Sequence, residues 1–360
     1  MVRIRHGWLV AALAITFSTA ACKKDEKKAP ATGGEVAKTT DTKPEVPAEK
    51  PPSAMGQVAS AVTAQVNPNS SDLALLPVDS EVVLGLNFAQ LQKSALWKKF
   101  VEPKMMQGDN QAKLSEFKAK CGFDPMSSVQ SISMGLKGLG GAKSPEGVVV
   151  VHGPEKSKVM GCMAKMKDEA AKEGSTITTD GDITMVTSKK GETFAFTYVG
   201  DTTLLGVIGP NATAVGVKAA AAGTSALKTS QAFVDMYSKI NTSDSMWILM
   251  NGNSKVFDQA AQMGFKPKAL FGSVNVTDGL TVNMRVRLDT PDQAAQITSM
   301  ANQQVAQFKS MVDKLDIVAD GSDVKLNLAL STQKLEALIT QFAGMMGGLG
   351  GGGGAGAGTP

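Results

Sequence analysis

Histidine is the side chain that most often serves as a general base, and this chain of 360 residues contains two. His6 lies in an apolar N-terminal leader, so His152 is the histidine that remains for a folded site. One histidine excludes a zinc site built from several, and no GxSxG nucleophile motif occurs. We expect His152 to end a buried strand (VVVVH) and to have no catalytic role.

A glycine-rich segment, Gly138–Ser144 (GLGGAKS), superficially resembles a phosphate-binding loop. Counting back from Lys143, Ala142 and Lys137 occupy the positions that this motif reserves for glycine. The segment also joins two expected strands and does not open a helix. We therefore interpret it as a hairpin loop without a nucleotide site.

Three methionines, Met160, Met163 and Met166, surround Cys162, and thioethers and thiolates are ligands that copper(I) prefers. The same spacing of three places them on the apolar face of a helix, together with Val159. We interpret them as core residues. Copper binding is the alternative.

Acidic and amide side chains give no clear site either. Four acids lie near the C-terminus: Asp313, Asp316, Asp320 and Asp323. They lack the alternate spacing and the closing Glu of a calcium-binding loop. Asn87 and Asn251 each follow an apolar strand and are expected to cap a helix or a turn. A matched ligand-binding role for the two Asn is the alternative. The sequence thus favours a protein without metal, cofactor or catalytic activity.

The first 21 residues have the three-part pattern of an export signal. Arg3 and Arg5 precede an uncharged apolar run, Gly7 to Phe17, and small residues lead to Cys22. The run is shorter than the roughly 20 residues that a membrane-spanning helix needs. The ending Thr-Ala-Ala-Cys resembles the lipobox of bacterial lipoproteins. This resemblance implies cleavage before Cys22 and diacylglycerol on its sulfur.

The lipoprotein resemblance also implies a location. Lys23 follows the cysteine, and not the Asp associated with retention in the inner membrane. We therefore expect an outer-membrane lipoprotein that faces the periplasm or the cell surface. Its attachment would be stable, because two or more acyl chains hold a protein firmly on a bilayer. The alternative is ordinary cleavage after Ala20 or Ala21, which would release the protein.

Cys121 and Cys162 are the two cysteines besides Cys22. In an oxidising compartment such a pair indicates a disulfide, here closing a loop of about 40 residues. A redox or metal-binding pair is the alternative, although no CxxC occurs and the spacing does not fit a zinc knuckle.

Composition limits the possible partners and marks both ends of the fold. Without the leader the chain has 35 basic and 33 acidic residues, because Arg3 and Arg5 are lost from 37, so no nucleic-acid binding is expected. Residues 22–71 are rich in Lys, Glu, Thr, Pro and Ala and predict a disordered linker after the lipidated cysteine. Residues 347–360 predict a disordered glycine-rich tail.

Between these ends, an internal repeat predicts two related α+β domains, 72–225 and 226–346. Each half shows the order strand, helix, strand, strand, helix, strand, strand. We therefore expect two β-α-β-β-α-β-β units with antiparallel sheets covered by helices. Asp-Gly pairs at 180–181, 278–279 and 320–321 predict tight hairpins. Helices are expected at 89–101, 156–173, 254–263, 291–315 and 333–346.

The folded part resembles uncharacterised Gram-negative envelope lipoproteins with repeated α+β units, a likeness that implies fold more than function. We expect a membrane-anchored envelope lipoprotein with a non-catalytic binding or scaffolding role. An envelope protein is a possible partner besides the membrane itself. The alternatives are a carrier of an apolar ligand held between helices and sheet, and a carboxylate-dependent hydrolase.

Overall fold

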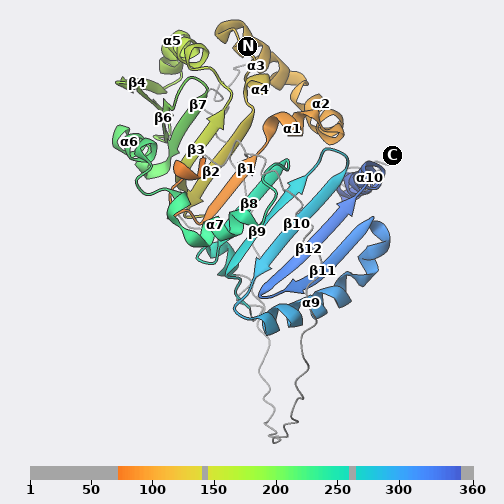
Figure 1. Cartoon of the computed structure of the whole chain (residues 1–360). Helices are drawn as coiled ribbons and strands as arrows, with labels where there is room; N and C mark the ends of the chain where they lie inside the picture. Colours follow the sequence, from red (N-terminus) through yellow and green to blue (C-terminus); the bar gives the residue numbers. More distant parts are fainter. Residues whose placement is uncertain (1–71, 140–144, 259–264, 350–360) are drawn as a thin grey trace, which may run out of the picture. The chain divides into compact units, whose positions relative to one another are not determined.

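The computed structural model describes residues 72–139, 145–258 and 265–349, and its side chains up to residue 340. Its strands form one twelve-stranded sheet in the order β11-β12-β10-β9-β8-β1-β2-β3-β7-β6-β5-β4 (Figure 1). Every pair of neighbouring strands is antiparallel. The predicted α+β class with antiparallel strands and covering helices is therefore confirmed. The predicted leader and linker lie outside the described residues.

The first half of the chain supplies seven strands and most of the helices. The strands are β1 (Val82–Leu86), β2 (Ser131–Lys137), β3 (Glu146–His152), β4 (Thr176–Asp180), β5 (Ile183–Thr187), β6 (Thr193–Tyr198) and β7 (Thr203–Ile208). The helical segments are α1 (Phe88–Lys93), η2 (Trp97–Val101), α2 (Glu102–Met105), α3 (Gly108–Cys121), α4 (Pro125–Ser128), α5 (Lys156–Lys172), η3 (Gly209–Asn211) and α6 (Ala214–Ala222).

The second half supplies the other strands. These are β8 (Met246–Asn251), β9 (Ala269–Asn275), β10 (Leu280–Arg287), β11 (Lys314–Asp320) and β12 (Asp323–Leu330). The helical segments are η4 (Leu227–Thr229), α7 (Gln231–Ser238), η5 (Lys255–Phe257), α9 (Pro291–Val305), η6 (Ala306–Met311) and α10 (Thr332–Leu349).

The segments expected as two domains contribute to a single sheet. β1 pairs with β8 along its whole length, from Val82 opposite Met250 to Leu86 opposite Met246. The sheet therefore continues from the first half of the chain into the second without a break.

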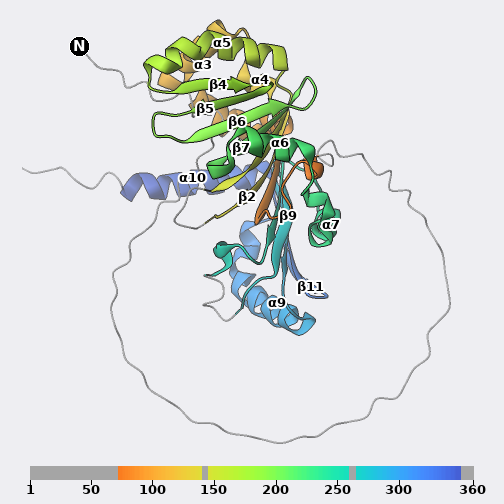
Figure 2. The same ribbon diagram turned by 90° about the vertical axis from the view of Figure 1, so that its left-hand side faces the viewer.

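The two faces of the sheet are covered by different helices. Successive residues of β3 illustrate this, because Val150 belongs to the core cluster of Val217 of α6 and Phe233 of α7, whereas Val151 belongs to the cluster that Met163 of α5 covers. We call these the α7 face and the α9 face, since cross-strand register places the α9 cluster on the same side as α5. Figure 2 views the sheet edge-on and shows α7 on one side and α10 on the other.

The Asp-Gly hairpins are confirmed, and their glycines adopt the positive φ that such turns require: +59° at Gly181, +109° at Gly279 and +57° at Gly321. Helix α5 also matches its predicted range closely.

Three predicted helices end earlier or later than expected. The segment 89–101 breaks at Ser94, whose hydroxyl donates to the Leu91 carbonyl and accepts from Trp97 N–H. The helix predicted to reach Leu315 is α-helical to Val305 and continues as the 3-10 helix η6 only to Met311, because Leu315 pairs with Leu328 in the sheet. The C-terminal helix continues to Leu349, three residues into the predicted tail. Helices α3 and α7 were not predicted, because α3 has a weak apolar stripe and α7 is short.

An ion-pair network attaches α7 to the second half of the sheet. Arg287 of β10 binds Asp323 of β12 through two nitrogens, at 2.7 and 3.1 Å, and Asp235 of α7 at 2.8 Å. The Arg287 hydrogen bond, with help from Lys239, holds the pKa of Asp235 below its usual range. The guanidinium also lies 5.1 Å from the centre of the Phe271 ring.

Candidate functional site

The α9 face of the second half carries a continuous apolar surface. Alternate residues of a strand point to one face, so registered neighbours across the sheet form rows. Two rows cross β1, β8, β9, β10 and β12 with no polar side chain. We call this surface the apolar floor. Its rows are Leu86, Met246, Val274, Val282 and Leu328, and Leu84, Ile248, Gly272, Met284 and Leu326.

The floor is incompletely covered by the described part of the chain. Gly272 is buried, and every other residue of the floor is partly exposed, with Met246 41% exposed. The same rows continue into the first half, where Val151 and Leu204 are buried beneath α5. Monomeric proteins rarely expose a wide contiguous apolar patch, so the floor is the strongest indication of a binding surface in the described residues.

Helical segments border the floor at its two ends. At one end α9 packs on β11 and β12, with Ala294 and Ile297 against Val324. At the other end stand α1 and η2, which follow β1, and α10, which follows β12 (Figure 1). Lys99 of η2 and Glu336 of α10 form an ion pair at 2.6 Å. These helical segments therefore lie at the two ends of the strands that form the floor.

On β10 and β12 the opposite face is polar, whereas on β1, β8 and β9 it carries the buried α7-face core. Thr281 and Asn283 of β10 are exposed, and Arg285 pairs with Asp320 at 3.0 Å. Lys325 also bonds to Asp320, and with Arg285 it lowers the pKa of that carboxyl. β12 thus alternates, with Leu326 and Leu328 on the floor side and Lys325 and Asn327 on the other.

His152 lies at the end of β3, as expected, but with specific neighbours. Its Nε2 lies 2.8 Å from Oδ1 of Asp72, which is 1% exposed, and its Nδ1 lies 3.1 Å from the Thr203 hydroxyl. Chemically, a carboxylate, an imidazole and a hydroxyl in this order could activate the hydroxyl as a nucleophile. Asp72 was not singled out from the sequence, because 80 residues separate it from His152.

The surroundings of His152 favour a structural interpretation. Asp72 begins the segment that enters the fold, and its carbonyl accepts hydrogen bonds from Leu75 and Leu76 N–H. Leu76 is fully buried, and the Leu227 N–H donates to its carbonyl. Two hollows of the described surface, one at the start of α5 and one beside α6, include neither His152 nor Thr203. We therefore interpret the contacts of Asp72, His152 and Thr203 as structural contacts that attach the first described segment to the sheet.

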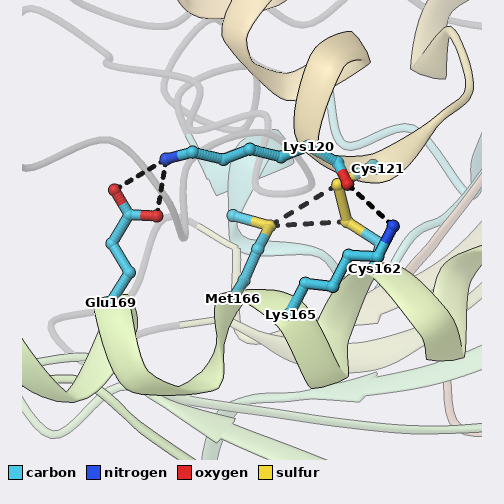
Figure 3. The surroundings of a disulfide bond; sticks show 6 residues. All are labelled: Lys120, Cys121, Cys162, Lys165, Met166 and Glu169. Atoms are coloured by element: carbon cyan, nitrogen blue, oxygen red, sulfur yellow. Dashed lines mark hydrogen bonds and ion pairs between the residues drawn. A yellow bond between two sulfur atoms is a disulfide. The ribbon is translucent and has the colours of Figure 1, made fainter.

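The predicted disulfide between Cys121 and Cys162 is confirmed, and Figure 3 shows its surroundings. It joins α3 to α5 with 4.6 Å between the Cα atoms. The Met166 sulfur lies 3.7 and 3.4 Å from the two bridged sulfurs, so this methionine packs on the disulfide. Lys120 adds an ion pair with Glu169 at 2.6 Å. The predicted lipidation site, Cys22, lies outside the described residues.

The other sequence candidates have structural roles. Met160 and Met163 pack against the sheet beneath α5, as the core interpretation predicted. Asn87 caps α1 by accepting from Gln90 N–H, and Asn251 accepts from Asn253 N–H in a turn. The four acids lie in or beside β11 and β12: Asp313, Asp316, Asp320 and Asp323. Residues 140–144 of the glycine-rich segment lie outside the described ranges.

Two surface hollows and the metal-binding side chains of the described residues add no further candidate site. One shallow hollow of about 520 Å³ lies at the start of α5, beside Glu155, Lys156 and Asp201. A second, of about 280 Å³, lies between α6 and the β4–β5 hairpin. In the three described ranges no group of three or more metal-binding side chains occurs. Nor does any described helix combine the length and apolarity needed to cross a membrane.

Comparisons with known proteins provide little further information. No family model matches the chain, and no curated protein is significantly similar to it. A solved structure, that of TP0453 in its crystal form I, is similar with a TM-score of 0.39 and 9% sequence identity. The match covers 75% of this chain and 96% of that chain. A TM-score of this size establishes no shared fold, and no residue role is transferred from it.

Proposed function

We propose that this chain is an exported lipoprotein, anchored through lipid on Cys22 to the outer membrane, that binds an apolar ligand on the apolar floor and performs no catalysis. The observation that carries the binding role is the partly exposed floor, which α9 and α10 border at opposite ends of the strands. Leaving such a surface in water is unfavourable, and a ligand that covers it recovers this free energy.

The anchor and the linker fit a carrier at a membrane. A lipid on Cys22 would keep the protein at the bilayer, where apolar ligands are concentrated. The linker of residues 22–71 would let the folded part reach away from the surface by tens of ångströms. Scaffolding of an envelope protein is the second role that the same floor would support, because protein partners also cover apolar patches.

We further infer that the two halves are related units, as the repeat predicted. The strand order supports this, because β1-β2-β3 and β8-β9-β10 run outward from the central β1–β8 pair. α5 follows β3 and α9 follows β10. The predicted order matches the β4–β5 hairpin with β11–β12. In the sheet, however, β6–β7 lies beside β3 as β11–β12 lies beside β10, so β4–β5 is an addition to the first half.

Mass spectrometry of the mature N-terminus tests the anchor. We expect a chain that begins at Cys22 and carries acyl groups, and a Cys22→Ser variant that leaves the membrane fraction. A Cys121→Ser variant is the matched control, because that cysteine is bonded inside the fold and its loss should leave fractionation unchanged. An unacylated N-terminus in the native protein would overturn the lipoprotein assignment.

Organic extraction of the purified protein tests the binding role. We expect apolar molecules to accompany the protein through gentle purification of the Cys22→Ser chain, which carries no lipid of its own. A protein partner recovered in their place would favour the scaffolding role. If the purified protein carries neither an apolar ligand nor a protein partner, the proposal is contradicted.

A further inference from the structure

The helical segments α1, η2 and α2 at one end of the floor, here called the rim, carry lysines that form no ion pair within the described residues. Lys98 of η2 and Lys104 of α2 are exposed, and neither forms an ion pair within the described residues. Their neighbour Lys99 binds Glu336 of α10, and Glu102 is the acid in this helical stretch. The rim therefore has an excess of positive charge.

The helical segments that carry these lysines lie at one end of the floor. α1 begins directly after β1, whose last residue, Leu86, belongs to the outer row of the floor. α10 begins directly after β12, and the Lys99–Glu336 ion pair joins the two helical segments. Figure 1 shows α1, α2 and α10 at the same end of the central strands. The cationic rim thus lies at the strand ends that border the apolar floor.

We propose that the ligand is a long-chain fatty acid, whose acyl chain covers the floor and whose carboxylate lies at Lys98 and Lys104. The argument is charge complementarity, because an anionic head group matches unpaired lysines beside an apolar surface. Five strands separated by about 4.8 Å give the floor a width of about 19 Å, comparable with an extended long acyl chain. This inference deepens the proposed function and depends on it.

A comparison of two probes tests the head group separately from the chain. Palmitate and hexadecanol share an acyl chain and differ in charge. Binding of each to the mature Cys22→Ser chain is measured by displacement of a fluorescent fatty acid. We expect palmitate to bind more tightly, by about fivefold, in low salt.

Two sets of variants locate the site. Met284→Gln on the floor should weaken both probes by roughly tenfold, because a buried amide replaces an apolar contact. Asn283→Gln, on the opposite face of the same strand, is the matched control. The pair Lys98→Gln and Lys104→Gln should weaken palmitate by about fivefold and leave hexadecanol unchanged. Lys172→Gln on α5 is the control for a surface lysine without an ion pair.

The outcomes separate this inference from the proposed function. Equal binding of palmitate and hexadecanol, unaffected by the lysine variants, would overturn the anionic head group and leave apolar binding intact. An unchanged affinity in Met284→Gln would remove the floor as the site. If neither probe binds, the apolar-ligand role itself fails. If the lysine variants lose binding of both probes, circular dichroism shows whether they are folded. Loss of hexadecanol binding in a folded lysine variant would contradict the proposal.

Discussion

The indole ring of Trp247 lies directly over Gly85, its registered neighbour across the β1–β8 pair. A Cβ atom at Gly85 would lie 2.0 Å from Cε2 of the indole, so this position has space for glycine alone. Trp247 is 2% exposed, and the Tyr237 ring meets it edge-on at 5.4 Å. This contact lies where the first half of the chain joins the second, and it belongs to the α7-face core.

Gly85→Ala should destabilise the fold by about 1–3 kcal/mol, because the added methyl group forces the indole or the strand to move. Urea unfolding measures the loss. Gly161→Ala is the control, since a Cβ there meets no atom within 4 Å and alanine favours the α5 helix. If both variants unfold at the wild-type midpoint, the close contact of Trp247 and Gly85 is wrong.

Removal of the Cys121–Cys162 disulfide should lower the free energy of unfolding by about 3–4 kcal/mol. The bridge spans 41 residues and restricts the unfolded chain accordingly. The double variant Cys121→Ser and Cys162→Ser is compared with wild type by thermal unfolding, with and without reductant. Reductant should lower the wild-type midpoint and leave that of the double variant unchanged. A wild-type protein with two titratable thiols and an unshifted midpoint would contradict this expectation.

Asp72→Ala should cost about 1–3 kcal/mol, because it leaves His152 without its carboxylate at the start of the folded region. Asp79→Ala is the matched control, since its pair with Lys137 is exposed and should contribute below about 1 kcal/mol. A double-mutant cycle with His152→Ala, read by urea unfolding, should give a coupling of about 1–2 kcal/mol. Strict additivity would show that the two side chains do not interact.

Alkaline pH should destabilise the protein through its two tyrosines, Tyr198 and Tyr237. Burial raises the pKa of Tyr198 to about 12, and burial, followed by the charge of Asp72, also raises the pKa of Tyr237. The unfolded chain loses these protons near pH 10, before the folded chain does. The stabilisation is therefore complete below about pH 10 and is lost as the pH rises from there through about 12.

Ultraviolet titration of tyrosinate checks this expectation. Neither tyrosine of the folded protein should ionise at its ordinary pKa, and Tyr198→Phe should remove the ionisation near pH 12. Full ionisation near pH 10 in a protein that is still folded by circular dichroism would show that the tyrosines are accessible.

Local patterns in the sequence were sufficient for several features of the fold. Asp-Gly pairs predict the hairpins at Gly181, Gly279 and Gly321, because few residue types adopt positive φ in tight turns. The apolar spacing of Met160, Met163 and Met166 predicts the buried side of α5, because helical periodicity sets which side chains share a face. The pairing of Cys121 with Cys162 follows from there being two cysteines to join beyond Cys22.

Long-range pairing is what the tertiary structure alone decided. The register of β1 against β8 places Trp247 over Gly85 and aligns side chains from five strands into the apolar floor, a surface that no single strand reveals. The contact of Asp72 with His152 depends on how the chain returns after 80 residues. Periodicity determines which face of an element is apolar, but the choice of neighbouring strands depends on the packing of the whole sheet.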